Sequence, residues 1–319
     1  MMNNLIGNTP LIKIKYRYNN NIKEIYVKLE FYNLTGSIKD RMAYYILNQA
    51  YNDGMLKKGQ TIIEATSGNT GISFSALGNY FNNPVVIFMP DWVSKERKKL
   101  MEMYGAKVYL VSKEEGGFQK CISLADELSK QINGFRPNQF NNLDNVNAHY
   151  LTTGNEIISS INNIGGFVSG IGTGGTLIGV GKRLKEEYSN VMLCAVEPDK
   201  IPLLTKGQFI EHHKIDGIGD DFIPELVDKN LIDRVFDIND DDAINMARLL
   251  CKKLGLGVGI SSGANFLGSI LLNEEGVGSV VTVFPDDNKK YLSTYLSKEI
   301  DKDCNFISNK IELISYDVV

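Results

Sequence analysis

A glycine-rich segment, residues 169–176, reads SGIGTGGT and follows the apolar pair Phe167-Val168. A helical pattern over residues 177–187 comes directly after it. Glycines let a backbone turn tightly against a ligand, and the free N–H groups at a helix start attract anions. The segment therefore predicts a phosphate-binding turn between a strand and a helix.

The spacing within this turn leaves its ligand open. No Gly-Lys-Ser/Thr follows, so the segment is not a nucleotide loop of the Walker type. It does spell GxGxxG through Gly170, Gly172 and Gly175, with Glu197 about twenty residues further on, as a dinucleotide site requires. A nicotinamide cofactor is one alternative, and a strand-to-helix turn without a ligand is another.

Two further segments place polar groups at helix starts. Residues 64–71 offer three hydroxyls, an amide and two glycines, which can donate to a carboxylate or phosphate, although ordinary helix capping uses the same residue types. The second segment, residues 33–42, puts Lys39 at a predicted helix start, where the helix dipole disfavours a positive charge. Lys39 is thus either an exposed surface residue or a lysine with a catalytic role.

The elements that would position these residues are short apolar runs alternating with helical patterns. The predicted strands are 24–29, 61–65, 84–89, 107–111, 167–169, 191–196 and 279–284. The predicted helices are 40–52, 69–81, 95–104, 119–131, 176–187 and 240–254. This alternation predicts an α/β fold with parallel sheets covered by helices on both faces. Residues 18–21 predict a polar turn between two strands, and the polar stretch 138–147 separates two groups of units.

The composition limits the kinds of partner that this protein is expected to bind. The chain has 34 basic and 38 acidic residues, a net charge of −4, and no polybasic block, so neither nucleic acid nor an anionic membrane is expected. No targeting segment or long apolar run is evident, which predicts a soluble, unprocessed, cytoplasmic protein. The four cysteines are scattered without a CxxC pair, and the three histidines lack companions, so no disulfide scaffold and no metal is expected.

Taken in order, seven segments resemble the cysteine synthase and cystathionine β-synthase family. They are Ile6-Gly7-Asn8-Thr9-Pro10-Leu11, Thr35-Gly36-Ser37-Ile38-Lys39-Asp40-Arg41, Thr66-Ser67-Gly68-Asn69-Thr70-Gly71, Gln139-Phe140, His149-Tyr150-Leu151-Thr152-Thr153-Gly154, Gly172-Thr173-Gly174-Gly175-Thr176 and Gly259-Ile260-Ser261-Ser262-Gly263. The resemblance runs from Ile6 to about Thr294, nearly the whole chain. The resemblance makes a nicotinamide cofactor at residues 169–176 the less favoured alternative, because this family uses pyridoxal 5′-phosphate.

The resemblance also implies the architecture. It predicts two three-layer α/β domains with mostly parallel sheets and pyridoxal 5′-phosphate in the cleft between them. Residues 1–38 and 146–319 would form a larger cofactor domain, and residues 39–145 a smaller, mobile substrate domain. The protein would be a homodimer that acts on small amino-acid substrates.

By resemblance, each matching residue receives a role. Lys39 would form the Schiff base with the cofactor aldehyde and act as general base toward the α proton. Asn69 would contact the ring hydroxyl, and Ser261 would face the ring nitrogen. The phosphate would be held by Gly172, Thr173, Gly174, Gly175 and Thr176. The substrate α-carboxylate would be bound by Thr66, Ser67, Thr70 and Gln139.

These residue types suit β-replacement. The cofactor is an electron sink for a carbanion at the α carbon, and the protein positions the bonds. A neutral serine at the ring nitrogen does not enforce a protonated pyridine, which favours elimination at the β carbon over transamination. The expected reaction passes through an aminoacrylate that accepts a nucleophile.

Asp220 and Asp221 depart from the commonest family pattern. Cysteine synthases that use O-acetylserine typically have Ala-Gly there, and cystathionine β-synthases usually have tyrosine in place of Asp220. A carboxylate would disfavour an approaching hydrosulfide anion. It could accept a proton from water or a thiol, or bind the ammonium of a second amino acid, or simply be a surface carboxylate. Residues 285–294 also lack the serine and glycine that cysteine synthases often show after the proline.

The working hypothesis is therefore a β-replacement that consumes cysteine and releases hydrogen sulfide, with water or a thiol as second substrate and with Asp220 as a catalytic and Asp221 as a substrate-binding residue. The alternatives are an O-acetylserine sulfhydrylase, a non-catalytic cofactor-binding or partner-docking module, and a serine or threonine deaminase.

Overall fold

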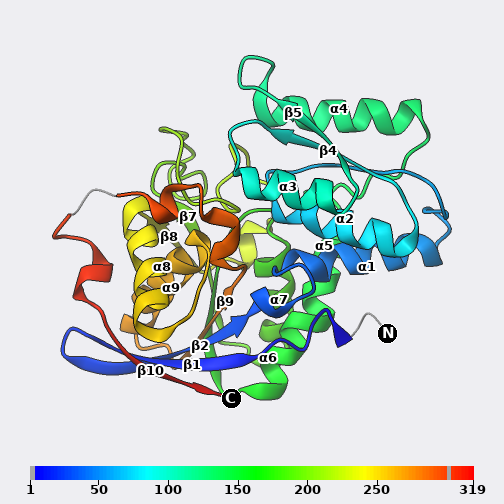
Figure 1. The fold of residues 1–319 in the computed structure, drawn as a ribbon. Helices are drawn as coiled ribbons and strands as arrows, with labels where there is room; N and C mark the ends of the chain where they lie inside the picture. The colour runs from blue at the N-terminus through cyan, green and yellow to red at the C-terminus, as the bar shows by residue number, and fades with distance from the viewer. Residues whose placement is uncertain (1–3, 300–302) are drawn as a thin grey trace.

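The computed structural model describes residues 4–299 and 303–319, which form two β-sheets with flanking helices (Figure 1). The strands are β1 (Leu11–Tyr18), β2 (Asn21–Leu29), β3 (Ile62–Ala65), β4 (Val85–Pro90), β5 (Lys107–Val111), β6 (Ile164–Gly170), β7 (Met192–Pro198), β8 (Arg234–Ile238), β9 (Ser279–Phe284) and β10 (Glu312–Val318). The α-helices are α1 (Lys39–Asn52), α2 (Asn69–Phe81), α3 (Lys95–Met103), α4 (Gly117–Gln131), α5 (Leu143–Ala148), α6 (Asn155–Ser160), α7 (Gly175–Glu187), α8 (Asp240–Leu254) and α9 (Ile260–Glu274). A π-helical turn, η3 (His149–Gly154), joins α5 to α6. Short 3-10 turns are η2 (Glu30–Tyr32), η4 (Lys229–Leu231), η5 (Asn288–Tyr291), η6 (Tyr295–Ser297) and η7 (Ile307–Lys310).

The larger sheet has seven strands in the order β10-β1-β2-β9-β6-β7-β8. Strands β2, β9, β6, β7 and β8 run parallel, whereas β1 is antiparallel to both of its neighbours. Asn19 and Asn20 form the tight turn between β1 and β2 with φ of 47° and 63°. Asparagine tolerates this left-handed backbone, which a two-residue hairpin requires, so the predicted polar turn is confirmed.

Helices cover both faces of the larger sheet. On one face, α8 and α9 pack against β1 and β2 through a core that includes Ile14, Val27, Leu250 and Phe266. On the other face, α6 and α7 pack against β6, β7 and β9. The result is a three-layer α/β arrangement with its core on both sides of the sheet.

The smaller sheet is built on the same plan. Strands β3, β4 and β5 are parallel. One face packs against α1, α2 and α3, and the other packs against α4, where Cys121 and Ala125 meet Ile63 and Phe88. Within the described residues, no helix is long and apolar enough to cross a membrane.

Every predicted strand and helix is present, with bounds that differ by a few residues. The unpredicted elements are β1, β8, β10, α5, α6, α9 and η3. Helix α9 is buried around nearly its whole circumference, so its sequence lacks the one-sided apolar period that marks a surface helix. The domain boundary at residues 145–146 falls within α5 and stays a prediction.

Candidate active site

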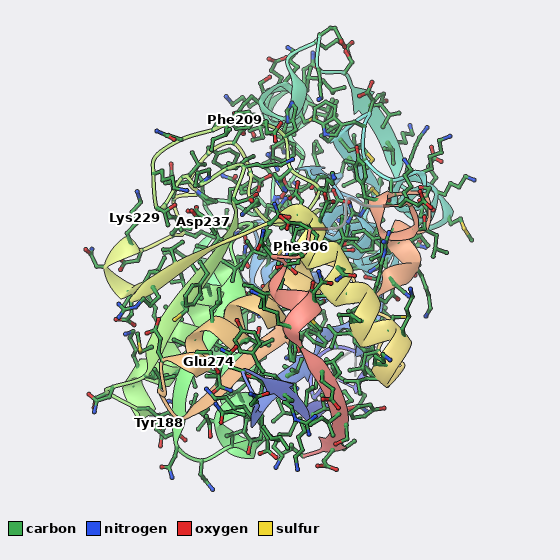
Figure 2. All side chains as sticks on the ribbon, turned by 90° about the vertical axis from the view of Figure 1, so that its left-hand side faces the viewer. Tyr188, Phe209, Lys229, Asp237, Glu274 and Phe306 are labelled. Atoms are coloured by element: carbon green, nitrogen blue, oxygen red, sulfur yellow. The ribbon has the colours of Figure 1, made fainter. Side chains whose placement is uncertain are left out.

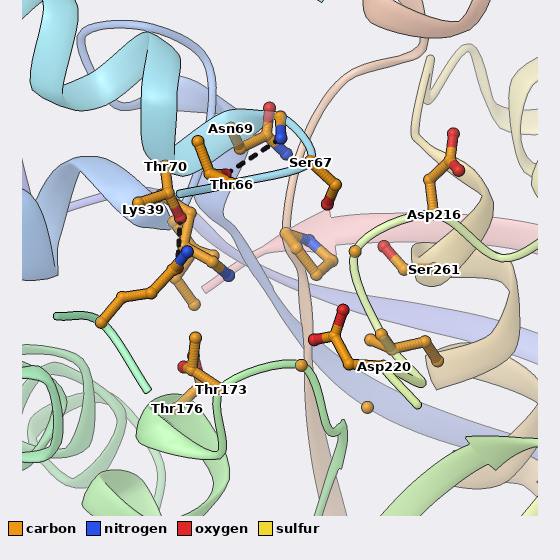
Figure 3. A pocket seen from close by; sticks show the side chains of 18 of the residues that line it. Lys39, Thr66, Ser67, Asn69, Thr70, Thr173, Thr176, Asp216, Asp220 and Ser261 are labelled. Carbon is orange, nitrogen blue, oxygen red and sulfur yellow. Dashed lines mark hydrogen bonds between the residues drawn. The ribbon is translucent and has the colours of Figure 1, made fainter. Parts of the chain in front are cut away.

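A cavity lies where the carboxyl end of β3, in the smaller sheet, meets the carboxyl ends of β6 and β9 in the larger one (Figure 3). Ligands bind at these strand ends in open α/β sheets because the loops there converge. The cavity brings together most of the predicted site residues. They are Lys39, Thr66, Ser67, Asn69, Thr70, Gln139, Gly172, Thr173, Gly174, Thr176, Asp220 and Ser261.

Two predicted site residues lie outside the cavity wall that the described residues form. Gly175 begins α7 behind the wall, and a Cβ on it would lie 2.0 Å from Oδ1 of Asn145. Asp221 is exposed. Gly175 therefore shapes the turn through close packing, and the predicted contact of Asp221 with substrate stays a prediction.

The glycine turn leads from β6 into α7. Gly174 has φ of +86°, which favours glycine, and a Cβ on Gly172 would lie 2.5 Å from the carbonyl oxygen of Gly217. The first N–H groups of a helix have no partner within it, so they are available to an anion. The turn thus has the backbone shape and the donors of a phosphate site.

Two buried polar residues hold the threonines of this turn. Asn145 donates from Nδ2 to Oγ1 of Thr173 and to the carbonyl of Gln139, both at 2.9 Å. Nε2 of His149 lies 3.3 Å from Oγ1 of Thr176. Burial, together with the charges of Arg41 and Lys39, lowers the pKa of His149 to about 3. His149 is therefore a neutral hydrogen-bonding partner at physiological pH.

The loop from β3 into α2 presents its polar groups to the opposite side of the cavity. Thr66 accepts from the backbone N–H of Gly68 through Oγ1 at 3.0 Å. Thr70 donates to Oε1 of Gln139 at 2.7 Å, and Gln139 donates from Nε2 to the carbonyl of Ala65 at 3.0 Å. In Figure 3, Thr66, Ser67, Asn69 and Thr70 lie on one side of the cavity, across from Asp220 and Ser261.

Lys39 is held at the cavity by the segment that precedes α1. The N–H of Ile38 donates to the carbonyl of Pro285 at 2.8 Å, which ties this segment to the end of β9. Burial lowers the pKa of Lys39, and the negative charges of Asp286 and Asp220 oppose that effect. A lysine with a lowered pKa is a better nucleophile and base than an exposed one.

A buried ion network fixes the first turn of α1. Arg41 donates from Nε to Glu30 and from Nη1 to Glu156, both at 2.6 Å. Burial would raise the pKa of Glu30, but the charge and hydrogen bonds of Arg41 prevail and lower it to about 2. Because Arg41 lies two residues after Lys39, the network holds the helix start that carries the lysine.

Asp220 faces the cavity from residues 213–221, here called the aspartate loop. His213 donates from Nε2 to the carbonyl of Gly219 at 2.8 Å, and the N–H of Gly219 donates to Ile171 at 2.8 Å. Burial and the charge of Asp221 raise the pKa of Asp220 to about 6, although Lys39 opposes them. Asp220 is therefore mostly ionised near neutral pH and titrates just below it.

The residues present fit pyridoxal 5′-phosphate. The cavity combines an anion-binding turn with a lysine amine and a neutral serine. Oδ1 of Asn69, a residue of the cavity wall, is buried and has no hydrogen-bond partner among the residues described. Buried polar groups normally have partners, so such an atom next to a cavity indicates a ligand.

The site also includes two residues to which the sequence had assigned no role. Arg97 lines the cavity from α3, and Asp286, which is not part of the lining, hydrogen-bonds to the cavity residue Asn69 at 2.7 Å. Asp286 falls in the segment that departs from the usual serine after the proline, which was the available signal. Arg97 sits in an ordinary charged helix, and nothing in its sequence surroundings marks it.

Comparison with known proteins supports the same cofactor. The family model described as "Pyridoxal-phosphate dependent enzyme" matches residues 2–286. A curated cysteine synthase from Staphylococcus aureus is 40% identical over 296 residues, which cover 92% of this chain and 95% of that protein.

Solved structures include hydrogen sulfide-producing enzymes. One from Fusobacterium nucleatum is 50% identical, with a TM-score of 0.95, and the match covers 100% of this chain and 98% of that one. A cysteine synthase from Entamoeba histolytica is 37% identical with a TM-score of 0.87, covering 97% and 94% of the two chains. The predicted fold and cofactor are thereby confirmed.

Proposed function

Because the chain belongs to the pyridoxal-phosphate dependent enzymes, as a member of the cysteine synthase and cystathionine β-synthase family, we propose that this β-replacement enzyme consumes cysteine and releases hydrogen sulfide. Water as second substrate would give serine, and a second thiol would give a thioether. The observation that carries the proposal is Asp220, a carboxylate in the cavity wall with a pKa of about 6. The hydrogen sulfide-producing enzyme of Fusobacterium nucleatum supports it by similarity.

The cofactor residues are those that the resemblance implies. When bound, pyridoxal 5′-phosphate withdraws electrons from the α carbon of an amino acid, so the α proton and a β substituent can leave. Lys39 takes the α proton and returns it at the end of the cycle. Asn69 and Ser261 orient the ring. The phosphate is held by Gly172, Thr173, Gly174, Gly175 and Thr176.

The substrate is bound on the α2 side. The start of α2 attracts the α-carboxylate, and the hydroxyls of Thr66, Ser67 and Thr70 with the amide of Gln139 hold it. Closure of the smaller domain, residues 39–145, excludes water until the leaving group has departed. Since Gln139 already bonds to Thr70 and Ala65, these groups would move together.

Asp220 selects the nucleophile. Its negative charge opposes the rebinding of free hydrosulfide, so released sulfide competes less with water or a second thiol for the β carbon. Its ionised oxygen can take a proton from water or from a thiol as either attacks the β carbon. Asp221, which is exposed, would meet the ammonium group of a second amino acid at the cavity mouth.

The second candidate is an O-acetylserine sulfhydrylase, and the similarity to curated cysteine synthases favours it. The two reactions are separable by their products. The purified enzyme is incubated with cysteine alone, with cysteine and homocysteine, and with O-acetylserine and sulfide, and the products are identified by mass spectrometry. Sulfide and serine from cysteine alone support the water reaction, and a thioether supports the thiol reaction. Rapid cysteine formation without sulfide release from cysteine overturns the proposal.

We also propose a homodimeric, cytoplasmic enzyme, as the resemblance implies. Light scattering coupled to size-exclusion chromatography measures the mass in solution, for which a dimer predicts twice the 35.5 kDa chain. A monomer at micromolar concentration would contradict the dimer. Fractionation of the producing cells tests the location.

A further inference from the structure

Asp286 is a buried acidic residue that the proposed mechanism does not use. It lies two residues after the end of β9, and its side chain is fully buried behind two residues of the cavity wall, Asn69 and Tyr291. Leaving a charge inside a protein is unfavourable unless other groups compensate it. Its partners therefore indicate what the position does.

Both partners of Asp286 are cavity residues. Asn69 donates from Nδ2 to Oδ2 of Asp286 at 2.7 Å, and the hydroxyl of Tyr291 donates to the same oxygen at 2.6 Å. Asn69 begins α2 beside the smaller sheet, whereas Asp286 follows a strand of the larger sheet. The Asn69–Asp286 hydrogen bond thus links the two sides of the site.

This bond determines which way the Asn69 amide points. The amide nitrogen donates to a carboxylate oxygen of Asp286, so the amide oxygen is directed away from this residue. The other end of the amide, Oδ1, is buried and has no partner within residues 4–299 and 303–319. One N–H and this oxygen are left for a ligand in the cavity.

We propose that Asp286 is a positioning residue that fixes the Asn69 amide against the ring hydroxyl of the cofactor. The proposal rests on the proposed role of Asn69. It holds whichever nucleophile the enzyme uses, because cofactor binding precedes that choice. A carboxylate holds an amide N–H more firmly than a neutral acceptor does.

Asp286 also lies beside the lysine. Its backbone forms an isolated antiparallel bridge with that of Ser37, two residues before Lys39. Among the charged groups that act on Lys39, Asp286 raises the pKa of the amine most, in opposition to burial, and Asp220 follows. Loss of the carboxylate would therefore alter both the ring contact and the protonation of Lys39.

A second set of contacts keeps Asp286 in place. The guanidinium of Arg97 lies 4.7 Å from the centre of the Tyr291 ring, and its Nη1 is 3.3 Å from Oδ2 of Asp216 in the aspartate loop. Tyr291 in turn donates to Asp286. Removing the Tyr291 hydroxyl should remove one hydrogen bond to Asp286 and leave the hydrogen bond between Asn69 and Asp286 in place.

The test measures cofactor affinity and the absorption spectrum of the bound cofactor. Cofactor is removed from the full-length enzyme and titrated back. Asp286→Ala should raise the dissociation constant about ten- to hundredfold and shift the absorption band, because a charge-assisted hydrogen bond is lost. Asp286→Asn can still accept from Asn69, so its dissociation constant for the cofactor should rise less than that of Asp286→Ala. The rise in Tyr291→Phe should be smaller still.

The matched control is Asp287→Asn. Asp287 is the next carboxylate, it accepts from the N–H of Lys289, and among the described residues it has no hydrogen bond to Asn69. Its variant should bind cofactor within about twofold of the unmodified enzyme. Asp286→Ala indistinguishable from this control in affinity and spectrum would overturn the proposal.

A double-mutant cycle with Asn69→Ala separates positioning from general structural support. If Asp286 acts through Asn69, Asp286→Ala should change cofactor affinity less than about threefold once Asn69 is absent. Independent, multiplying effects would overturn the proposal. Asp286→Asn replaces the alanine in the cycle if that variant does not fold. An unchanged affinity in Asn69→Ala alone would instead refute the proposed role of Asn69.

Discussion

The glycine turn and the aspartate loop face the same cavity, but they are built differently. The glycine turn connects β6 directly to α7, and its shape follows from its own backbone and from close contacts at Gly172 and Gly175. The aspartate loop belongs to the long connection between β7 and β8, which has little regular structure and also carries Phe209 and Lys229 (Figure 2). Side chains hold it, notably His213 and Asp216.

This difference separates two tasks. A short turn between two regular elements can hold a cofactor phosphate with little freedom, because the strand and the helix fix both of its ends. A loop held by a few side chains can change its residues without disturbing the sheet. We therefore expect the cofactor chemistry to depend on the regular elements and the choice of nucleophile to depend on the loop.

Lys39→Ala should produce the largest loss of activity, because Lys39 is required both for cofactor binding at the glycine turn and for every reaction next to the aspartate loop. Loss of the group that holds the cofactor and moves the α proton should lower turnover by about 10³-fold or more with any substrate. Sulfide release from cysteine and cysteine formation from O-acetylserine are both measured. A variant that retains one of the two reactions would contradict the assignment.

Asp220→Asn should affect only the aspartate-loop side. Removing a general base should lower sulfide release from cysteine and water by about 10²–10³-fold, while the cofactor spectrum stays unchanged. Cysteine formation from O-acetylserine and sulfide should stay level or rise, because the repulsion of hydrosulfide is relieved. Glu225→Gln, at an exposed acidic residue shortly after the loop, is the matched control.

The pH dependence gives a check on the same residue. Asp220 accepts a proton only when ionised, so turnover should fall about tenfold per unit below a pH of about 6 and level off above it. The acidic limb should disappear in Asp220→Asn. An identical limb in that variant would assign the titration to another group.

Gly175→Ala should affect the glycine-turn side. The added Cβ would clash with the side chain of Asn145, which donates to Thr173 in the turn, and such overpacking typically costs about 1–3 kcal/mol. Cofactor affinity should fall about ten- to hundredfold, with thermal stability reduced. The ratio of sulfide release to cysteine formation should be preserved, and a changed ratio would show that the two loops are not separable.

His213→Gln should have the smallest effect. It removes the ring that accepts from Ile215 and donates to Gly219, so the loop around Asp220 should loosen. We expect a decrease of about fivefold in sulfide release, the scale of one neutral hydrogen bond, with unchanged cofactor affinity. The same substitution at the exposed neighbouring residue, His212→Gln, should leave sulfide release and cofactor affinity unchanged. Equal effects of the two variants would remove His213 from the positioning of Asp220.

The regular elements were largely predictable, and the exceptions have physical causes. Helix α8 has a polar and an apolar face, so its period is visible, whereas α9 is apolar on nearly all sides and shows none. Strand β10 pairs at the sheet edge with mostly exposed residues, so it lacks the apolar run that marked the central strands. Its position depends on β1, far away in the sequence.

The candidate site was predictable wherever a motif determines its own local shape. The strand–glycine–helix sequence around Gly172 and the hydroxyl-rich start of α2 both indicate anion binding because a helix start attracts anions wherever it lies. The position of Lys39 at a helix start left a surface lysine and a catalytic lysine both open, and the resemblance of residues 35–41 to the family motif selected the catalytic role. The structure adds the surroundings that set the pKa of Lys39. Burial lowers this pKa, and the charges of Asp286 and Asp220 oppose that effect.

The sequence by itself determined the elements with a visible apolar period, the cofactor and most of the residues around it, because each of these depends on short segments read in order. Only the tertiary structure decided that Asp220 and not Asp221 faces the cavity, and that Asp286 bonds to Asn69. Adjacent loop residues point in different directions according to packing, and a hydrogen bond between β9 and α2 spans most of the chain. Interactions of that range arise from folding, and no local pattern encodes them.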